Sequence, residues 1–144
     1  MTEHSLWRVS RALHAAINDG ETELLDSVLD DDVDWAIYGP IDMFPFLGAR
    51  RGKRAVIDVC RQIARHIRFR RLDRESVMLG DGQAASLVRY SLTSTASSKP
   101  ISVRAAHFAQ FKRGRLSCLR VLLDTFDLVE QSLGHPIHLP AAAI

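Results

Sequence analysis

The sequence predicts an α+β fold in one domain that spans residues 1–144. Apolar residues between Leu6 and Ile17 repeat with the spacing of a helix, whereas from Arg68 onward they alternate with a period of two. A chain of 144 residues is long enough for one domain with a sizeable core. The predicted order of elements is ααβαββββα, in which the last four strands form a continuous antiparallel meander.

Two helices and a strand are predicted at the start of the chain. The first helix ends at Gly20, and its buried face consists of Leu6, Val9, Leu13, Ala16 and Ile17. A second, short helix turns Leu24, Leu25, Val28 and Leu29 inward, and the aspartates at 30–32 end it. Residues 33–38 then alternate as a strand, with one side formed by Val33, Trp35 and Ile37.

A loop and a third helix come next. Residues 39–52 hold three glycines and two prolines, which predicts a loop or lid without regular structure. The third helix runs from about Lys53 to Ile67, and its buried stripe consists of Val56, Val59, Cys60, Ile63 and Ile67. We expect the first and third helices to pack on the same face of the sheet.

The second half of the chain alternates with the period of strands. Strands are predicted at 68–79, 84–95, 101–112 and 115–123, and the turn between the last two lies at Arg113-Gly114. A last helix begins after Asp124, whose side chain is suited to accept hydrogen bonds from first-turn amides, and ends at Gly134. The tail, 135–144, is expected to be extended, so the folded core covers about residues 5–134.

Composition and charge exclude several classes of protein. No apolar run approaches the roughly 20 residues that span a bilayer, and the start of the chain lacks the pattern of a secretory signal. Cys60 and Cys118 are far apart and form no metal-type pair, which favours reduced thiols in a cytoplasmic protein.

Residues 50–74 carry ten Lys or Arg, yet Phe69 is the one aromatic residue among them, which argues against nucleic-acid binding. We interpret the charges as solvated faces.

An ordered set of short segments resembles a known family. The set includes Asn18-Asp19-Gly20, the aspartates before Trp35, the Pro-Gly lid, Gly80-Asp81-Gly82 and the turn at Arg113-Gly114. In this order they resemble the SnoaL-like and ketosteroid-isomerase-like branch of the nuclear transport factor 2 superfamily, over about residues 5–134. The resemblance implies a cystatin-like cone, in which a curved antiparallel sheet wraps around helices and a pocket lies at the wide end.

The catalytic residues of that family do not carry over to this chain. By resemblance, Ile37 stands at the position of the isomerase general base, Leu13 at that of the tyrosine, and His107 at that of the protonated aspartate. Val121 stands near the last aspartate of the limonene-epoxide-hydrolase-like members. The resemblance therefore implies the pocket without the steroid-isomerase or epoxide-hydrolase chemistry.

His107 and Tyr90 are the polar candidates for such a pocket. His107 shares a strand face with Ala105 and Ala109, whose small side chains leave room around an imidazole that could bond a ligand or transfer a proton. Tyr90 shares a face with Val88 and Leu92, and its hydroxyl needs a partner. Both residues could equally be satisfied core side chains. The expected lining consists of Leu13, Trp35, Ile37, Val88, Tyr90, Leu119 and Val121.

Two functions remain open at this point. The first is a pocket protein that binds a small, mostly apolar molecule, including an isomerase-, cyclase- or hydrolase-type enzyme that uses His107. The second is a non-catalytic homodimeric module that associates through the outer sheet face, which would carry Arg89, Arg104, Phe108, Gln110 and Arg120. No cofactor motif is present, and His135 and His138 alone do not predict a metal site.

Overall fold

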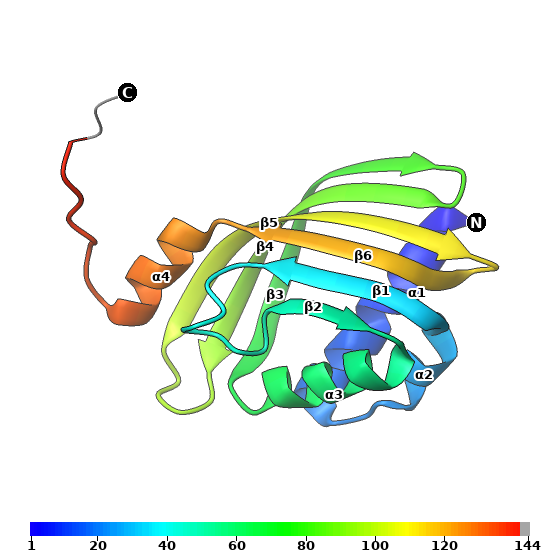
Figure 1. The fold of residues 1–144 in the computed structure, drawn as a ribbon, viewed down its shortest axis with the longest axis horizontal. Coiled ribbons are helices and arrows are strands. Elements are labelled where there is room, and N and C mark those ends of the chain that lie inside the picture. Colours follow the sequence, from blue (N-terminus) through cyan, green and yellow to red (C-terminus); the bar gives the residue numbers. More distant parts are fainter. Residues whose placement is uncertain (142–144) are drawn as a thin grey trace.

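The computed structural model describes residues 1–141, and Figure 1 shows their arrangement. The elements in this part of the chain are α1 (Thr2–His14), a π-helical turn η1 (Ala15–Asp19), α2 (Glu23–Val28), β1 (Leu29–Tyr38), β2 (Gly48–Arg51), α3 (Lys53–Ala64), β3 (Ile67–Gly80), β4 (Gln83–Ser94), β5 (Pro100–Lys112), β6 (Arg115–Leu123) and α4 (Thr125–Leu133). The predicted α+β class and the four-stranded meander β3–β6 are confirmed.

The six strands form one curved sheet in the order β2-β1-β6-β5-β4-β3. Every neighbouring pair is antiparallel except β1 and β6, which run parallel with Trp35 opposite Leu119. The expectation of a wholly antiparallel sheet is therefore wrong at this pair. The long excursion through α3 and the meander returns β6 beside β1 in the same direction.

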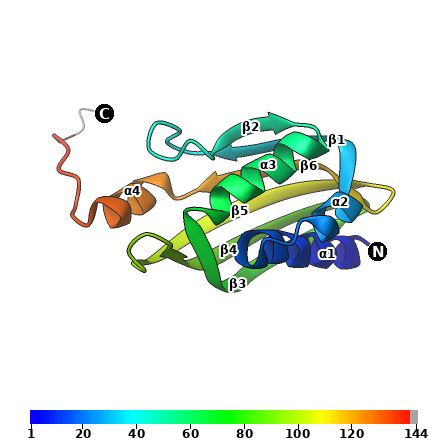
Figure 2. The same ribbon diagram turned by 90° about the horizontal axis from the view of Figure 1, so that it is seen from below.

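Helices α1 and α3 cover the concave face of the sheet, as predicted (Figure 2). Contacts of α1 are with β3, β4, β5 and β6, whereas α3 contacts η1 and β1. Their buried stripes match the helical spacing, since Leu6, Val9 and Ala12 of α1 and Val56, Val59 and Ile63 of α3 are all buried. The core thus lies between these two helices and the sheet.

Three sequence predictions in the first half of the chain need correction. Gly48–Arg51 form strand β2, paired antiparallel with β1, inside the stretch that was expected to be a loop. Gly48 begins this strand and Gly52 follows it, with φ angles of 99° and 91°, which glycine adopts at low cost. The aspartates at 30–32 lie in β1 rather than at the end of a helix. Leu24 is exposed, not turned inward.

Helix α4 ends the fold as expected. The Asp127 backbone N–H donates to Asp124 Oδ1 at 3.4 Å, so Asp124 caps the helix, and Gly134 closes it in the left-handed conformation. Residues 135–141 form neither helix nor strand, and the rest of the predicted tail lies outside the described residues.

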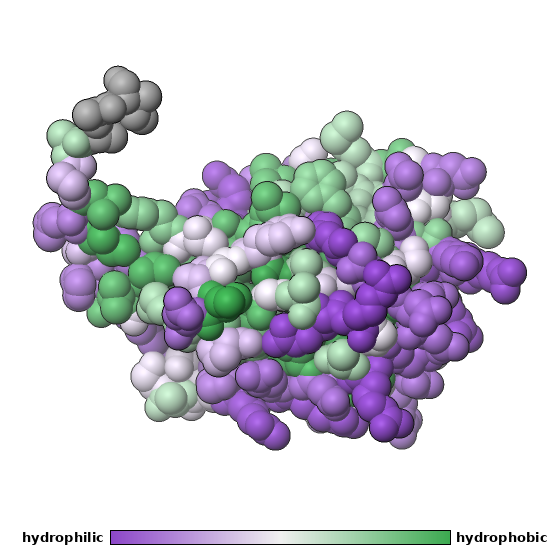
Figure 3. All heavy atoms as spheres, viewed as in Figure 1, coloured by the Kyte–Doolittle hydropathy of each residue, from purple (hydrophilic) through white to green (hydrophobic). Residues whose placement is uncertain are grey.

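Hydrophobic side chains gather over α4 and the residues that follow it (Figure 3). No helix in residues 1–141 is long and apolar enough to cross a membrane.

Candidate functional site

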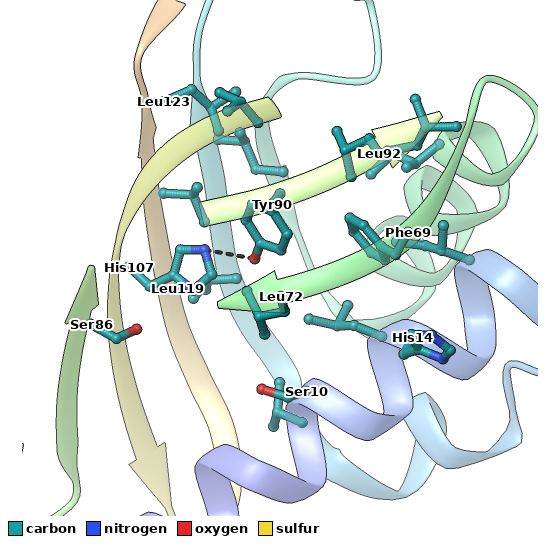
Figure 4. A pocket seen from close by; sticks show the side chains of 18 of the residues that line it. Ser10, His14, Phe69, Leu72, Ser86, Tyr90, Leu92, His107, Leu119 and Leu123 are labelled. Carbon is teal, nitrogen blue, oxygen red and sulfur yellow. Dashed lines mark hydrogen bonds between the residues drawn. The ribbon is translucent and has the colours of Figure 1, made fainter. Parts of the chain in front are cut away.

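A cavity of about 330 Å³ lies between the concave face of the sheet and helix α1 (Figure 4). That volume is within the range of small-molecule sites. Most of its wall is hydrocarbon, contributed by α1, β4, β5, β6 and the segment between β1 and β2. The polar side chains on the wall are those of Ser10, His14, Arg70, Arg71, Ser86, Tyr90 and His107.

Tyr90 and His107 form a hydrogen-bonded pair inside this cavity. The Tyr90 Oη and His107 Nε2 atoms are 2.8 Å apart (Figure 4). The two residues come from adjacent strands, β4 and β5, and the period-two alternation turns both toward the concave face. Phe69 of β3 stacks on Tyr90 with ring centroids 5.3 Å apart, which holds the phenol ring in place.

Burial keeps both members of the pair uncharged. It lowers the pKa of His107 from 6.5 to about 4, and the positive charge of Arg74 adds to this effect. Burial also raises the pKa of Tyr90, an effect that Arg74 partly opposes. At pH 7 the pair is therefore a neutral imidazole and a neutral phenol. A neutral imidazole has one N–H, which is on either Nδ1 or Nε2.

Trp35 contributes a flat wall and an unused donor. Its side chain is 2% exposed, and among the described residues its Nε1 is the one completely inaccessible side-chain nitrogen or oxygen without a hydrogen-bond partner. An unpaired buried donor costs about 1–3 kcal/mol of stability. Trp35 lies across β6 from Ala109, two residues from His107 on β5, since Leu119 pairs with both Trp35 and Ala109.

The structure places most of the expected lining residues on the cavity wall. Besides Tyr90 and His107, these are Leu13, Trp35, Ile37, Leu119 and Val121. Val88 is different, because it is 0% exposed and belongs to the packed core rather than to the wall.

Sequence reasoning missed several wall residues. Ser86 shares the alternation of Val88 and Tyr90, and Ser10 is spaced between Leu6 and Leu13 as on one helical face. Those two serines could have been found by period alone. Phe44 and Phe46 come from the irregular segment before β2, where no period exists. Phe46 stacks on His66, with ring centroids 5.5 Å apart, and so holds this segment against the residues after α3.

The described residues offer no metal site. Within residues 1–141, no three His, Cys, Asp or Glu side chains are grouped so that they could hold a metal ion. Cys60 and Cys118 are both free, and burial raises the pKa of the Cys60 thiol to about 12, so that it stays protonated. Of the polar wall residues, His14, Arg70 and Arg71 already bond to Asn18, Thr93 and Asp73. The polar groups that remain for a ligand are those of Tyr90, His107 and the two serines.

The comparisons with known proteins agree with this architecture. The family model described as a SnoaL-like domain matches residues 10–118. A candidate isomerase from Rhodopseudomonas palustris is 67% identical, with a TM-score of 0.90 over 94% of this chain and 100% of that chain. No curated protein matches the sequence significantly.

More distant structures share the fold alone. An epoxide hydrolase from M. tuberculosis, described as LEH-like, is 15% identical, with a TM-score of 0.69 over 90% of each chain. A protein from Catenulispora acidiphila with a ketosteroid-isomerase-like fold, in complex with trimethylamine, is 12% identical. Its TM-score is 0.69 over 89% of this chain and 93% of that chain.

Proposed function

The chain belongs to the SnoaL-like domain family, and we propose that it binds a small, mostly apolar molecule whose carbonyl or hydroxyl oxygen bonds to the Tyr90–His107 pair. The observation that carries this proposal is a polar pair at 2.8 Å in a wall that is otherwise mostly hydrocarbon. Ligand sites usually combine an apolar lining with a few oriented polar groups.

The pair suits either kind of oxygen because the imidazole is neutral. When Nε2 carries the proton, it donates to Tyr90 Oη, and the phenol O–H is free to donate to a ligand carbonyl. When Nδ1 carries the proton, the phenol donates to Nε2, and Tyr90 Oη accepts from a ligand hydroxyl. Both arrangements keep the 2.8 Å contact.

For catalysis, the pair favours polarisation of a carbonyl over proton transfer by His107. With a pKa of about 4, the His107 imidazole is a weak base. It is also uncharged at pH 7, so no imidazolium is present to act as a general acid. A phenol O–H aimed at a carbonyl oxygen stabilises negative charge that develops there. The candidate isomerase from R. palustris, at 67% identity, supports isomerisation as the reaction class.

A matched pair of probes tests this proposal. We compare 2-acetylnaphthalene with 2-ethylnaphthalene, which has nearly the same shape but no oxygen, by calorimetric titration of wild type and Tyr90→Phe. Loss of one hydrogen bond costs about 0.5–1.5 kcal/mol, so the preference for the ketone should fall roughly two- to tenfold. Tyr38→Phe, at an exposed tyrosine, is the control and should leave the preference unchanged. Equal preferences in wild type and Tyr90→Phe would contradict the proposal.

The outer sheet face favours association as a homodimer. One row of apolar residues crosses four strands there, in the register Leu87–Ala106–Leu122–Tyr38. Phe108, 51% exposed, lies beside this row. Ion pairs flank it, with Glu75 between Arg89 and Arg104 on one side and Asp34 with Arg120 on the other. An apolar centre with a charged rim is typical of a protein interface.

A cytoplasmic location fits this proposal, since Cys60 and Cys118 are both free. The non-catalytic module remains the second candidate. It rests on the outer face alone and needs no chemistry in the cavity.

A further inference from the structure

A positive charge lies behind the polar part of the cavity. Arg74 of β3 donates through Nη2 to Ser10 Oγ on α1 at 3.0 Å, and Ser10 lines the cavity. The side chain of Arg74 is half-buried, and no carboxylate of residues 1–141 lies within 4 Å of its guanidinium. By contrast, Arg71 on the same strand pairs with Asp73 at 2.7 Å. Arg74 is thus a cation with a neutral partner.

The strand register brings Arg74 to the same face as the Tyr90–His107 pair. Arg74 is directly opposite Val88, the buried residue between Ser86 and Tyr90 on the inner face of β4. Residues directly opposite one another in neighbouring strands share a face. The charge of Arg74 reaches both members of the pair, because it lowers the pKa of His107 and that of Tyr90.

Ser86 supplies a second unused group at this end. It is 7% exposed, lines the cavity, and its hydroxyl makes no hydrogen bond to any side chain or backbone group of residues 1–141. Ser86 pairs directly with His107 across β4 and β5. In Figure 4, Ser86 and His107 lie on one side of the cavity, whereas Phe69 and Leu92 lie on the other. Tyr90, His107 and Ser86 therefore form a polar end of the cavity. The other polar wall residues, His14, Arg70 and Arg71, bond to Asn18, Thr93 and Asp73.

We propose that this polar end is a carboxylate subsite, so that the ligand is a small apolar carboxylic acid. This inference rests on the proposed function, because it uses the same cavity. Ser10 accepts from Arg74 and keeps its own O–H, which can donate to an anion. The hydroxyls of Ser86 and Tyr90 supply two further donors. A buried carboxylate is tolerated only where charge and hydrogen bonds compensate for its lost hydration, and here both are present.

The test uses two probes of nearly equal shape, 2-naphthylacetate and 2-naphthylacetamide, titrated calorimetrically into the full chain at pH 7. Wild type should bind the acid about tenfold more tightly than the amide, because a charge-assisted contact is stronger than a neutral one. Arg74→Gln should abolish most of this preference. Arg115→Gln removes the same charge at an exposed position and should keep the preference within about twofold. Ser86→Ala should weaken acid binding about three- to tenfold, with little effect on the amide.

Each result bears on one proposal or on both. If the amide binds but the acid does not bind more tightly, the pocket stands and the carboxylate subsite is wrong. An unchanged preference in Arg74→Gln and Ser86→Ala also overturns the subsite. If neither probe binds wild type, both the subsite and the proposed function fail. If Arg74→Gln lowers the melting temperature strongly, the Ser86→Ala result decides, since that change removes a hydroxyl without a partner.

Discussion

The two faces of the sheet treat polar side chains in opposite ways. On the inner face, Tyr90 and His107 bond to each other and Ser86 bonds to nothing among the described residues. On the outer face, the charged residues pair across strands, as Arg120 does with Asp34 at 2.9 Å. Strands β4 and β5 thus carry neutral polar groups toward the cavity and charged residues such as Arg89 and Arg104 toward solvent.

The pKa shifts on the two faces of the sheet have different causes. Inside, burial is the first cause, and it drives His107 and Tyr90 toward their neutral forms. Outside, the hydrogen bond from Arg120 is the first cause, and it lowers the pKa of Asp34, which favours the charged form. A charged group on the outer face is therefore stabilised by the ion pairs that it forms with its neighbours. A polar group on the inner face has lost its hydration, and a ligand that bonds to it can offset that desolvation cost.

The largest contrast is expected from the same truncation on the two faces of β6. Leu116 is 0% exposed and Leu122 is 47% exposed. Leu116→Ala should lower the free energy of unfolding by about 2–5 kcal/mol, because it leaves a hole in the core. Leu122→Ala should cost less than half of that loss. Urea unfolding at equal protein concentration measures both, and similar losses would contradict the assignment of the two faces.

The next contrast concerns pH. His107 has a pKa of about 4 in the folded chain against 6.5 when unfolded, so between these values the unfolded state binds more protons. Stability should be full above pH 6.5 and fall as the pH drops toward 4, by about 3 kcal/mol at most. His107→Gln should flatten this part of the curve. His4→Gln, at an exposed position, should not. Equal pH dependence in wild type and His107→Gln would rule out a buried neutral imidazole.

The outer face gives a third, smaller effect. A charge in the apolar row should disfavour association, so Phe108→Asp should raise the dimer dissociation constant about tenfold or more. Light scattering should then show a mass near 16.1 kDa for the variant and twice that value for wild type. Leu79→Asp, at an exposed leucine on the edge strand β3, serves as control and should leave the mass unchanged. A monomer mass for the wild-type protein would contradict the proposed homodimer.

The smallest effect is expected at Trp35. Trp35→Phe removes apolar surface but also removes the unpaired N–H, so the two changes oppose each other. The free energy of unfolding should change by less than about 1 kcal/mol, whereas Trp35→Ala should cost about 3–5 kcal/mol. Thermal unfolding followed by circular dichroism compares the two variants. A loss for Trp35→Phe as large as for Trp35→Ala would show that the indole N–H is satisfied.

The alternation of apolar and polar residues along the strands predicted much of the architecture. It separated His107 from Phe108 and Tyr90 from Arg89, which lie on opposite faces of the sheet as expected. Strand β2 and the parallel pairing of β1 with β6 were missed, because pairing between distant segments leaves no mark in the local period. The wall residues Phe44 and Phe46 were missed for the same reason, since they come from an irregular segment.

The charge on Arg74 was the least predictable feature. Ten Lys or Arg between residues 50 and 74 look alike in the sequence. Arg70 and Arg71 line the cavity, whereas Arg74 reaches Ser10 behind its wall. These positions depend on the register of β3 against β4, which shifts between Phe69 and Arg71 and again after Arg74. Counting by twos along β3 therefore fails at these irregularities. Only the folded chain shows that Arg74 meets Ser10 of α1.

The central claim is that Tyr90 and His107 form a hydrogen bond to a ligand oxygen inside an apolar cavity. The most direct measurement is the infrared stretch of the carbonyl of 2-acetylnaphthalene, labelled with carbon-13 and bound to the protein. In wild type the stretch should lie below its value in a hydrocarbon solvent, because the Tyr90 O–H donates to the carbonyl oxygen. In Tyr90→Phe it should return to the hydrocarbon value. A stretch that is the same in both proteins would contradict the claim.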